Sequence, residues 1–80
     1  MDPKQIQTLI EQNLSESRAD VRTDGQGHYE AVVICPAFEG KRSVARHQLV
    51  YGALGQRVGR EIHALALKTF TPEEWQASGR

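Results

Sequence analysis

The longest apolar run of the chain, Ala31–Ala37 with Pro36 inside it, constrains the fold more than any other segment. It completes the segment His28–Cys35 (HYEAVVIC), whose β-branched and apolar residues are typical of a strand. Pro36 ends that strand because proline cannot donate to a sheet ladder. The run is far too short to cross a bilayer, so we expect no membrane contact. The remaining segments are expected to pack around a strand at 28–35.

The residues before this strand predict a helix and a hairpin. Asp2-Pro3 is a typical helix start, and apolar residues then recur at helical spacing as far as Leu14. From Ala19 to Thr23 the period changes to the alternation of a half-buried strand. Asp24-Gly25-Gln26-Gly27 predicts the turn into the next strand, because glycine and aspartate tolerate the positive φ of hairpin turns.

The residues after Pro36 predict a helix, a third strand and a short last helix. The helix is expected to begin with Ser43 as its N-cap and to end near Gly59. Glu61–Phe70 predicts the third strand, which should pair in parallel within the sheet because a helix precedes it. Thr71-Pro72-Glu73-Glu74 is a capping box that starts the last helix, and Trp75 should anchor it. One apolar face of the longer helix is expected to comprise Val44, His47, Val50, Tyr51, Leu54 and Val58.

The order of elements is therefore α-β-β-α-β-α, and the fold class is α+β, with a three-stranded mixed sheet and helices on one face. Eighty residues with 39% apolar content suffice for one core, so we expect one domain over residues 1–80. The lone Cys35 excludes an intrachain disulfide. Together with the lack of a signal peptide, it favours a reducing cytoplasm. We expect a cytoplasmic domain that is monomeric in isolation.

Charge is segregated along the chain although the net charge is zero. Residues 1–40 hold three basic and seven acidic side chains, whereas residues 41–60 hold five basic and no acidic ones. Such a segment is a candidate docking surface for an anionic partner, and the alternative is a solvated helix face. The neutral total argues against non-specific nucleic-acid binding by the whole chain. The candidate docking residues are Lys41, Arg42, Arg46, Arg57 and Arg60.

Three segments together resemble the BolA-like family, in particular its short YrbA-type branch. They are FEGKRSVARHQLVY at 38–51, IHALALKTFTPEEW at 62–75 and the strand HYEAVVIC at 28–35. The resemblance runs from about Ile6 to Trp75 and implies an α-β-β-α-β-α fold similar to a class II KH domain. It also implies a non-enzymatic role: members pair with monothiol glutaredoxins and share a [2Fe–2S] cluster with them, in iron–sulfur trafficking or iron sensing. Some members are described as DNA-binding regulators of stress and cell-shape genes.

The resemblance also assigns cluster ligands. It implies that His63 is the constant ligand and that His28 takes the place of a variable second ligand, located in or after the hairpin. The simpler alternatives are that His63 bonds to nearby backbone and that His28 is an exposed hairpin residue without a role. An iron–sulfur cluster needs four ligands, so two histidines require a partner. In the family the glutaredoxin cysteine and glutathione supply the rest, and we expect no cofactor in the isolated chain.

The remaining candidates are interpreted as structural. Cys35 lies late in an apolar strand, where a small buried hydrophobe is the expected role, and His47 lies on the apolar face of its helix. We find no nucleophile–base pair and no phosphate-binding loop, so we expect no enzyme. DNA binding through the basic helix is the alternative function. It is weakened because Gly40-Lys41-Arg42-Ser43 lacks the second glycine of a KH GXXG loop.

Overall fold

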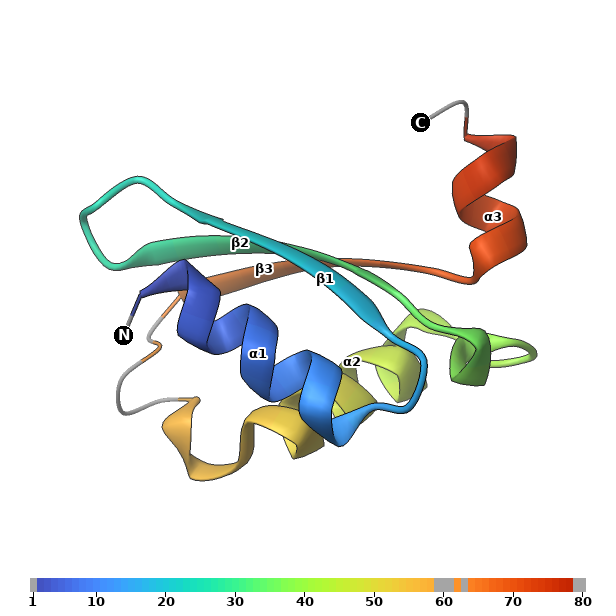
Figure 1. Cartoon of the computed structure of the whole chain (residues 1–80), viewed down its shortest axis with the longest axis horizontal. Coiled ribbons are helices and arrows are strands. Elements are labelled where there is room, and N and C mark those ends of the chain that lie inside the picture. Colours follow the sequence, from blue (N-terminus) through green and yellow to red (C-terminus); the bar gives the residue numbers. More distant parts are fainter. Residues whose placement is uncertain (1, 59–61, 63, 79–80) are drawn as a thin grey trace.

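The fold is a three-stranded sheet with two helices packed on one face (Figure 1). The computed structural model describes residues 2–58, 62 and 64–78. The strand order is β1-β2-β3, with β1 antiparallel to β2 and β2 parallel to β3. The predicted α+β class, element order and mixed sheet are confirmed. The elements are α1 (Pro3–Asn13), β1 (Arg18–Thr23), β2 (His28–Ile34), α2 (Ser43–Leu54), β3 (Ala64–Phe70) and α3 (Pro72–Ala77), with 3₁₀ turns at Pro36–Phe38 and Gly55–Arg57.

Helices α1 and α3 begin with the predicted capping residues. Asp2 Oδ1 accepts a hydrogen bond from Gln5 N at 2.9 Å, and Gln5 Oε1 accepts one from Asp2 N at 3.0 Å. Thr71 and Glu74 repeat this reciprocal arrangement at α3, with distances of 3.1 and 2.8 Å. Each box satisfies two backbone groups that a helix start leaves unpaired. No helix in the described residues is both long enough and apolar enough to cross a membrane.

Helix α2 is shorter than predicted. Arg42, not Ser43, is the N-cap, and its side chain makes no capping hydrogen bond. The helix ends at Leu54 rather than near Gly59, because Gly55 takes a positive φ of 64°. Glycine adopts this conformation without the steric cost that a Cβ would add, so it stops the helix.

The predicted apolar face of α2 is wrong at three positions, because Val58 lies beyond the end of the helix and Val44 and Tyr51 are exposed. Val50 and Leu54 are buried, whereas Val44 is 71% and Tyr51 is 39% exposed. At about 100° per residue, Val44 and Tyr51 lie roughly 100° and 80° from the direction midway between Val50 and Leu54. The buried face of α2 is therefore narrower than the apolar face that the sequence predicts.

The core lies between the helical layer and the sheet. The odd-numbered residues of β2 face this layer, and Ala31 and Val33 among them are fully buried. Each fully buried Val, Leu, Ile or Phe side chain contributes about 1.5–3 kcal/mol of transfer free energy, so these contacts hold the helices against the sheet. The buried cluster comprises Ile6, Ile10, Leu14, Val21, Ala31, Val33, Cys35, Phe38, Val50, Leu54 and Ile62.

The opposite face of the sheet is covered by neither α1 nor α2 (Figure 1). Helix α3 follows β3 at the end of the sheet away from the β1–β2 hairpin. Trp75 anchors it as predicted, with its ring edge-on to Phe70 at 5.3 Å between centroids. Two ion pairs lie on the strands of this face, Arg22 with Asp20 at 3.4 Å and Lys68 with Glu30 at 3.9 Å.

Side chains of α1 cover the free edge of β1. Gln7 Oε1 accepts a hydrogen bond from Val21 N, and Glu11 Oε2 accepts one from Ala19 N, both at 3.0 Å. An edge strand presents unpaired backbone groups that can pair with another chain. These two bonds satisfy two such groups and fix α1 along β1.

Candidate functional site

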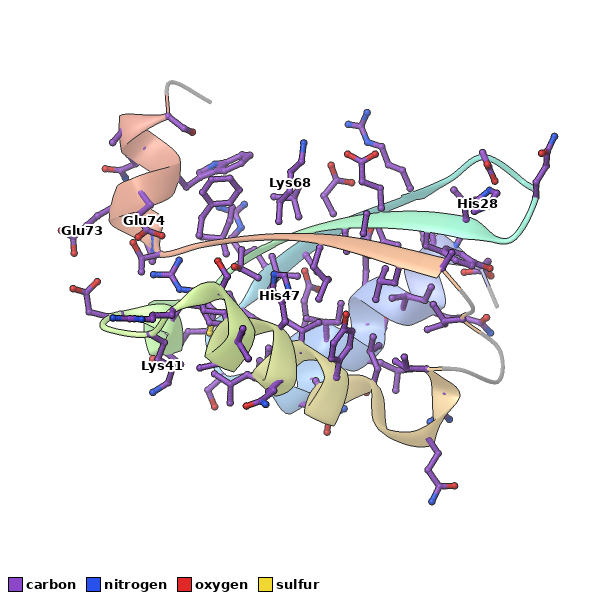
Figure 2. All side chains as sticks on the ribbon, turned by 180° about the vertical axis from the view of Figure 1, so that it is seen from behind. His28, Lys41, His47, Lys68, Glu73 and Glu74 are labelled. Atoms are coloured by element: carbon purple, nitrogen blue, oxygen red, sulfur yellow. The ribbon has the colours of Figure 1, made fainter. Side chains whose placement is uncertain are left out.

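His28 is the first residue of β2 and lies at the hairpin end of the sheet (Figure 2). Its side chain is 68% exposed, and its ring nitrogen Nδ1 lies 2.8 Å from Asp24 Oδ2. Nε2 is thus the nitrogen left for an external atom. A neutral imidazole with one such nitrogen is a common metal ligand. The position is compatible with the ligand role expected for His28, and that role stays a prediction.

The turn before His28 holds its backbone. Thr23 Oγ1 donates to the His28 carbonyl at 2.9 Å and accepts from Gly25 N at 3.1 Å. Asp24 Oδ1 accepts from Gln26 N at 2.7 Å. This backbone bond, followed by the bond to the His28 ring, holds the pKa of Asp24 below its ordinary value. The sequence reasoning treated Asp24 only as a turn residue, although its spacing of four from His28 was a usable signal.

The register of the sheet relates the two histidine candidates. His28 lies opposite Ala64 in the β2–β3 pair, and Ala64 directly follows His63 in the sequence. His63 itself lies outside the described residues, so its ligand role remains a prediction. Beside His28 is an open depression of about 390 Å³, lined by Arg22, Thr23, Asp24, His28, Tyr29, Glu30 and Ala66.

The described residues do not complete a metal site by themselves. Across 2–58, 62 and 64–78, no three His, Cys, Asp or Glu side chains come together as a metal-binding group. Cys35 is fully buried, as predicted, and its Sγ lies 3.6 Å from the Ser15 carbonyl oxygen. His47 is half-buried, with its ring edge-on to Tyr51. Among the described residues, His28 is thus the exposed side chain with a free nitrogen for a metal.

Arg46, one of the docking residues expected from the sequence, is paired within the chain. Its side chain is only 12% exposed, and its Nη1 and Nη2 donate to the two Glu74 carboxylate oxygens at 2.7 and 3.1 Å. Its Nε donates to the Lys41 carbonyl at 2.7 Å. The bond with Glu74 raises the pKa of Arg46 and lowers that of Glu74 from 4.5 to about 2. Arg46 therefore joins the start of α2 to α3.

The other basic candidates divide between the two ends of α2. Lys41 and Arg42 precede the helix, and Arg57 lies in the 3₁₀ turn that follows it; all three are exposed. The 12-residue helix separates these ends by about 18 Å. Figure 2 shows Lys41 at the end of the molecule opposite His28. Arg60 lies outside the described residues.

The C-terminal end of α2 lies at the same end of the molecule as the β1–β2 hairpin and the start of β3 (Figure 1). Arg57 therefore lies at the His28 end, and Tyr51 is one turn before the end of the helix. Tyrosine and arginine are enriched at protein interfaces. Sequence reasoning missed this combination, because it assigned Tyr51 to the core and treated all five cations as one surface.

Residues 2–74 match the family model described as BolA-like protein. The DNA-binding transcriptional regulator BolA of Haemophilus influenzae is 35% identical over 85 residues, covering 90% of this chain and 82% of that protein. The acid stress protein IbaG of Escherichia coli K12 is 33% identical over 76 residues, covering 94% and 89%. A bolA protein homologue from Coxiella burnetii has a similar structure, with a TM-score of 0.85, 49% identity and coverage of 95% and 97%. Neither named relative carries the name of an enzyme.

Proposed function

The chain belongs to the BolA-like family, and from this premise we propose that it is a non-enzymatic adaptor that binds a monothiol glutaredoxin. In this proposal His63 and His28 complete the ligands of a shared [2Fe–2S] cluster, and the glutaredoxin cysteine and glutathione supply the others. The observation that carries it is the exposed imidazole of His28, opposite the residue that follows His63. Iron–sulfur trafficking and iron or stress regulation are the roles that such a cluster serves.

The chemistry of the donor set supports a shared site. A cluster needs four ligands, and the described residues offer one exposed histidine and no accessible thiol. Histidine in place of thiolate raises the reduction potential of a [2Fe–2S] cluster. A cluster with two histidine ligands should therefore differ in potential and visible spectrum from one held by thiolates alone.

The arrangement of basic residues suggests which surface meets the glutaredoxin. A partner that reaches His28 approaches the hairpin end of the molecule, where the 3₁₀ turn after α2 also lies, and Arg57 in this turn is exposed. Its guanidinium can form paired hydrogen bonds with a carboxylate of the partner or of glutathione. Lys41 and Arg42 lie at the other end, so we assign Arg57, and not these two, to glutaredoxin docking.

The test is co-purification with a monothiol glutaredoxin, followed by visible absorption and circular dichroism of the complex. The wild-type chain should give a coloured heterodimer with a spectrum distinct from that of the glutaredoxin homodimer. His63→Ala and His28→Ala should each change that spectrum. His47→Gln is the matched control, because the chain has three histidines and only His47 is assigned a structural role. A spectrum unchanged by His63→Ala would refute the ligand assignment.

DNA binding is the second candidate, favoured by the name of the Haemophilus influenzae relative. Lys41, Arg42 and Arg57 are the exposed cations of residues 41–58. Lys41 and Arg42 lie together before α2, and each phosphate that they neutralise should contribute about 0.9 to the slope of log affinity against log salt, so we expect a slope near −2. Arg42→Ala should reduce that slope by about one. A gel shift with no sequence preference, or none near physiological salt, would exclude this function.

A further inference from the structure

The hydrogen bonds around His28 hold both its main chain and its ring. Its carbonyl accepts from Thr23 Oγ1 at 2.9 Å and from Asp24 N at 3.4 Å. Its amide N lies 3.4 Å from Asp24 Oδ1, and its ring Nδ1 lies 2.8 Å from Asp24 Oδ2. Asp24 thus contacts both the main chain and the ring of His28. The orientation of the exposed ring is set by the turn rather than by the core.

The two oxygens of Asp24 have different partners. Oδ1 accepts from Gln26 N at 2.7 Å, which is the bond of an aspartate that stabilises a turn. Oδ2 is directed to the imidazole. An ionised carboxylate can only accept hydrogen bonds, so a neutral His28 ring must carry its proton on Nδ1. Nε2 then holds a lone pair.

We propose that Asp24 is a positioning residue that fixes the His28 imidazole in the Nδ1–H tautomer, with Nε2 as the donor atom for an iron of the shared cluster. The inference rests on the proposed function, since it concerns how one proposed ligand is prepared. Histidines that bind metals commonly donate their second ring N–H to a carboxylate, which fixes the tautomer and the ring orientation. Loss of such a partner typically weakens metal binding about 10- to 100-fold.

A purely structural role for Asp24 is the competing explanation, and it makes a different prediction for Asp24→Asn. The asparagine oxygen can still accept from Gln26 N, so the turn is retained. Its amide nitrogen then faces His28 Nδ1 and donates to it. The ring proton must move to Nε2, and the lone pair needed by the metal is lost. Asp24→Asn therefore preserves the turn and inverts the tautomer.

The experiment uses the isolated full chain, labelled with ¹⁵N, in mildly alkaline buffer where imidazole is neutral. Two-bond ¹H–¹⁵N correlation spectra identify which ring nitrogen of His28 carries the proton. We expect Nδ1–H in the wild type and Nε2–H in Asp24→Asn. The matched control is Asp20→Asn, an exposed aspartate of the adjacent strand whose partner is Arg22, and it should leave the His28 tautomer unchanged.

A second measurement tests the consequence for the cluster. Glutaredoxin titrations should show that Asp24→Asn weakens formation of the cluster-bearing heterodimer about 10-fold or more, whereas Asp20→Asn changes it less than about 2-fold. The inference is overturned if the wild-type ring carries its proton on Nε2, or if Asp24→Asn leaves the tautomer unchanged. It is also overturned if Asp24→Asn inverts the tautomer without weakening cluster binding. Failure of the proposed function is separately visible, because His28→Ala would then leave the heterodimer spectrum unchanged while the tautomer of the isolated chain still reports on Asp24.

Discussion

Replacing Arg46 with alanine should lower the free energy of unfolding by about 2 to 3 kcal/mol, although the basic residues of segment 41–60 predict an exposed charged surface there. The substitution removes the paired bonds to Glu74, the bond to the Lys41 carbonyl and a weaker one to the Thr69 carbonyl at 3.4 Å. It also removes the guanidinium from above the Phe38 ring, where it lies 5.8 Å from the centroid. These contacts tie α2 to α3 and to the end of β3.

The magnitude follows from how each contact is exposed. The Arg46 side chain is 12% exposed, but Glu74 is 46% exposed, so solvent screens the ion pair and limits it to about 1 kcal/mol or less. The bond to the Lys41 carbonyl contributes about 1 kcal/mol, and the contact with Phe38 about 0.5–1 kcal/mol. For a domain of this size, the combined loss corresponds to a fall in Tm of about 10 to 20 °C.

Thermal unfolding followed by circular dichroism measures this effect, and urea unfolding converts it to free energy. Arg42→Ala is the matched control, because it removes the same side-chain type from an exposed position and should change stability by about 0.5 kcal/mol or less. Arg46→Lys should recover little, since an ammonium cannot form the paired bonds to a carboxylate. If Arg46→Ala and Arg42→Ala melt within a few degrees of each other, the assignment of Arg46 to the fold is refuted.

Three further outcomes are expected. The pKa of Glu74 is lowered from 4.5 to about 2, so its charge stabilises the fold fully above about pH 4.5 and loses this effect as pH falls toward 2. The difference in unfolding free energy between the wild type and Glu74→Gln, measured in urea, should therefore close over that range. Replacing both Gln7 and Glu11 with alanine should lower the free energy of unfolding by about 1 to 2 kcal/mol and speed amide hydrogen exchange at the β1 edge. Unchanged exchange would show that other contacts protect this edge. Arg57→Glu should raise the dissociation constant of the glutaredoxin complex about 10-fold in calorimetry, whereas Arg42→Glu should leave it nearly unchanged. Equal effects of the two substitutions would contradict docking at the hairpin end.

The elements of the fold were predictable because their signals are local. A change of period at Ala19, a turn of aspartate and glycine at 24–27 and two capping boxes each depend on residues within about four positions. The parallel pairing of β3 also followed, since a helical connection joins it to β2. The residue at which α2 ends could not be predicted as closely from the sequence. Both Gly55 and Gly59 can stop a helix, and the structure uses the first.

The role of Arg46 was not predictable from the sequence, because its partner is 28 positions away. Glu74 was recognised as the N3 residue of a capping box that begins at Thr71, and that role is correct. The same carboxylate has a second function that only the packing of α3 beside α2 creates: Oε1 accepts from both Thr71 N and Arg46 Nη1. The exposure of Tyr51 could not be predicted from the sequence for the same reason. Helical periodicity places it near the apolar stripe, but how much of a helix face is covered depends on its neighbours.

The position of Arg46 changes how the basic segment can act. With its central guanidinium neutralised by Glu74, the exposed charge of the described segment is left at the two ends of α2, about 18 Å apart. That distance exceeds the Debye length of about 8 Å at physiological salt, so the two ends act on partners independently. In the proposed adaptor function a glutaredoxin at His28 would meet the end with Arg57, whereas in the alternative function a nucleic acid would use Lys41 and Arg42 at the other end. The two candidate functions therefore require different surfaces of one molecule, and single charge reversals at Arg57 and Arg42 separate them.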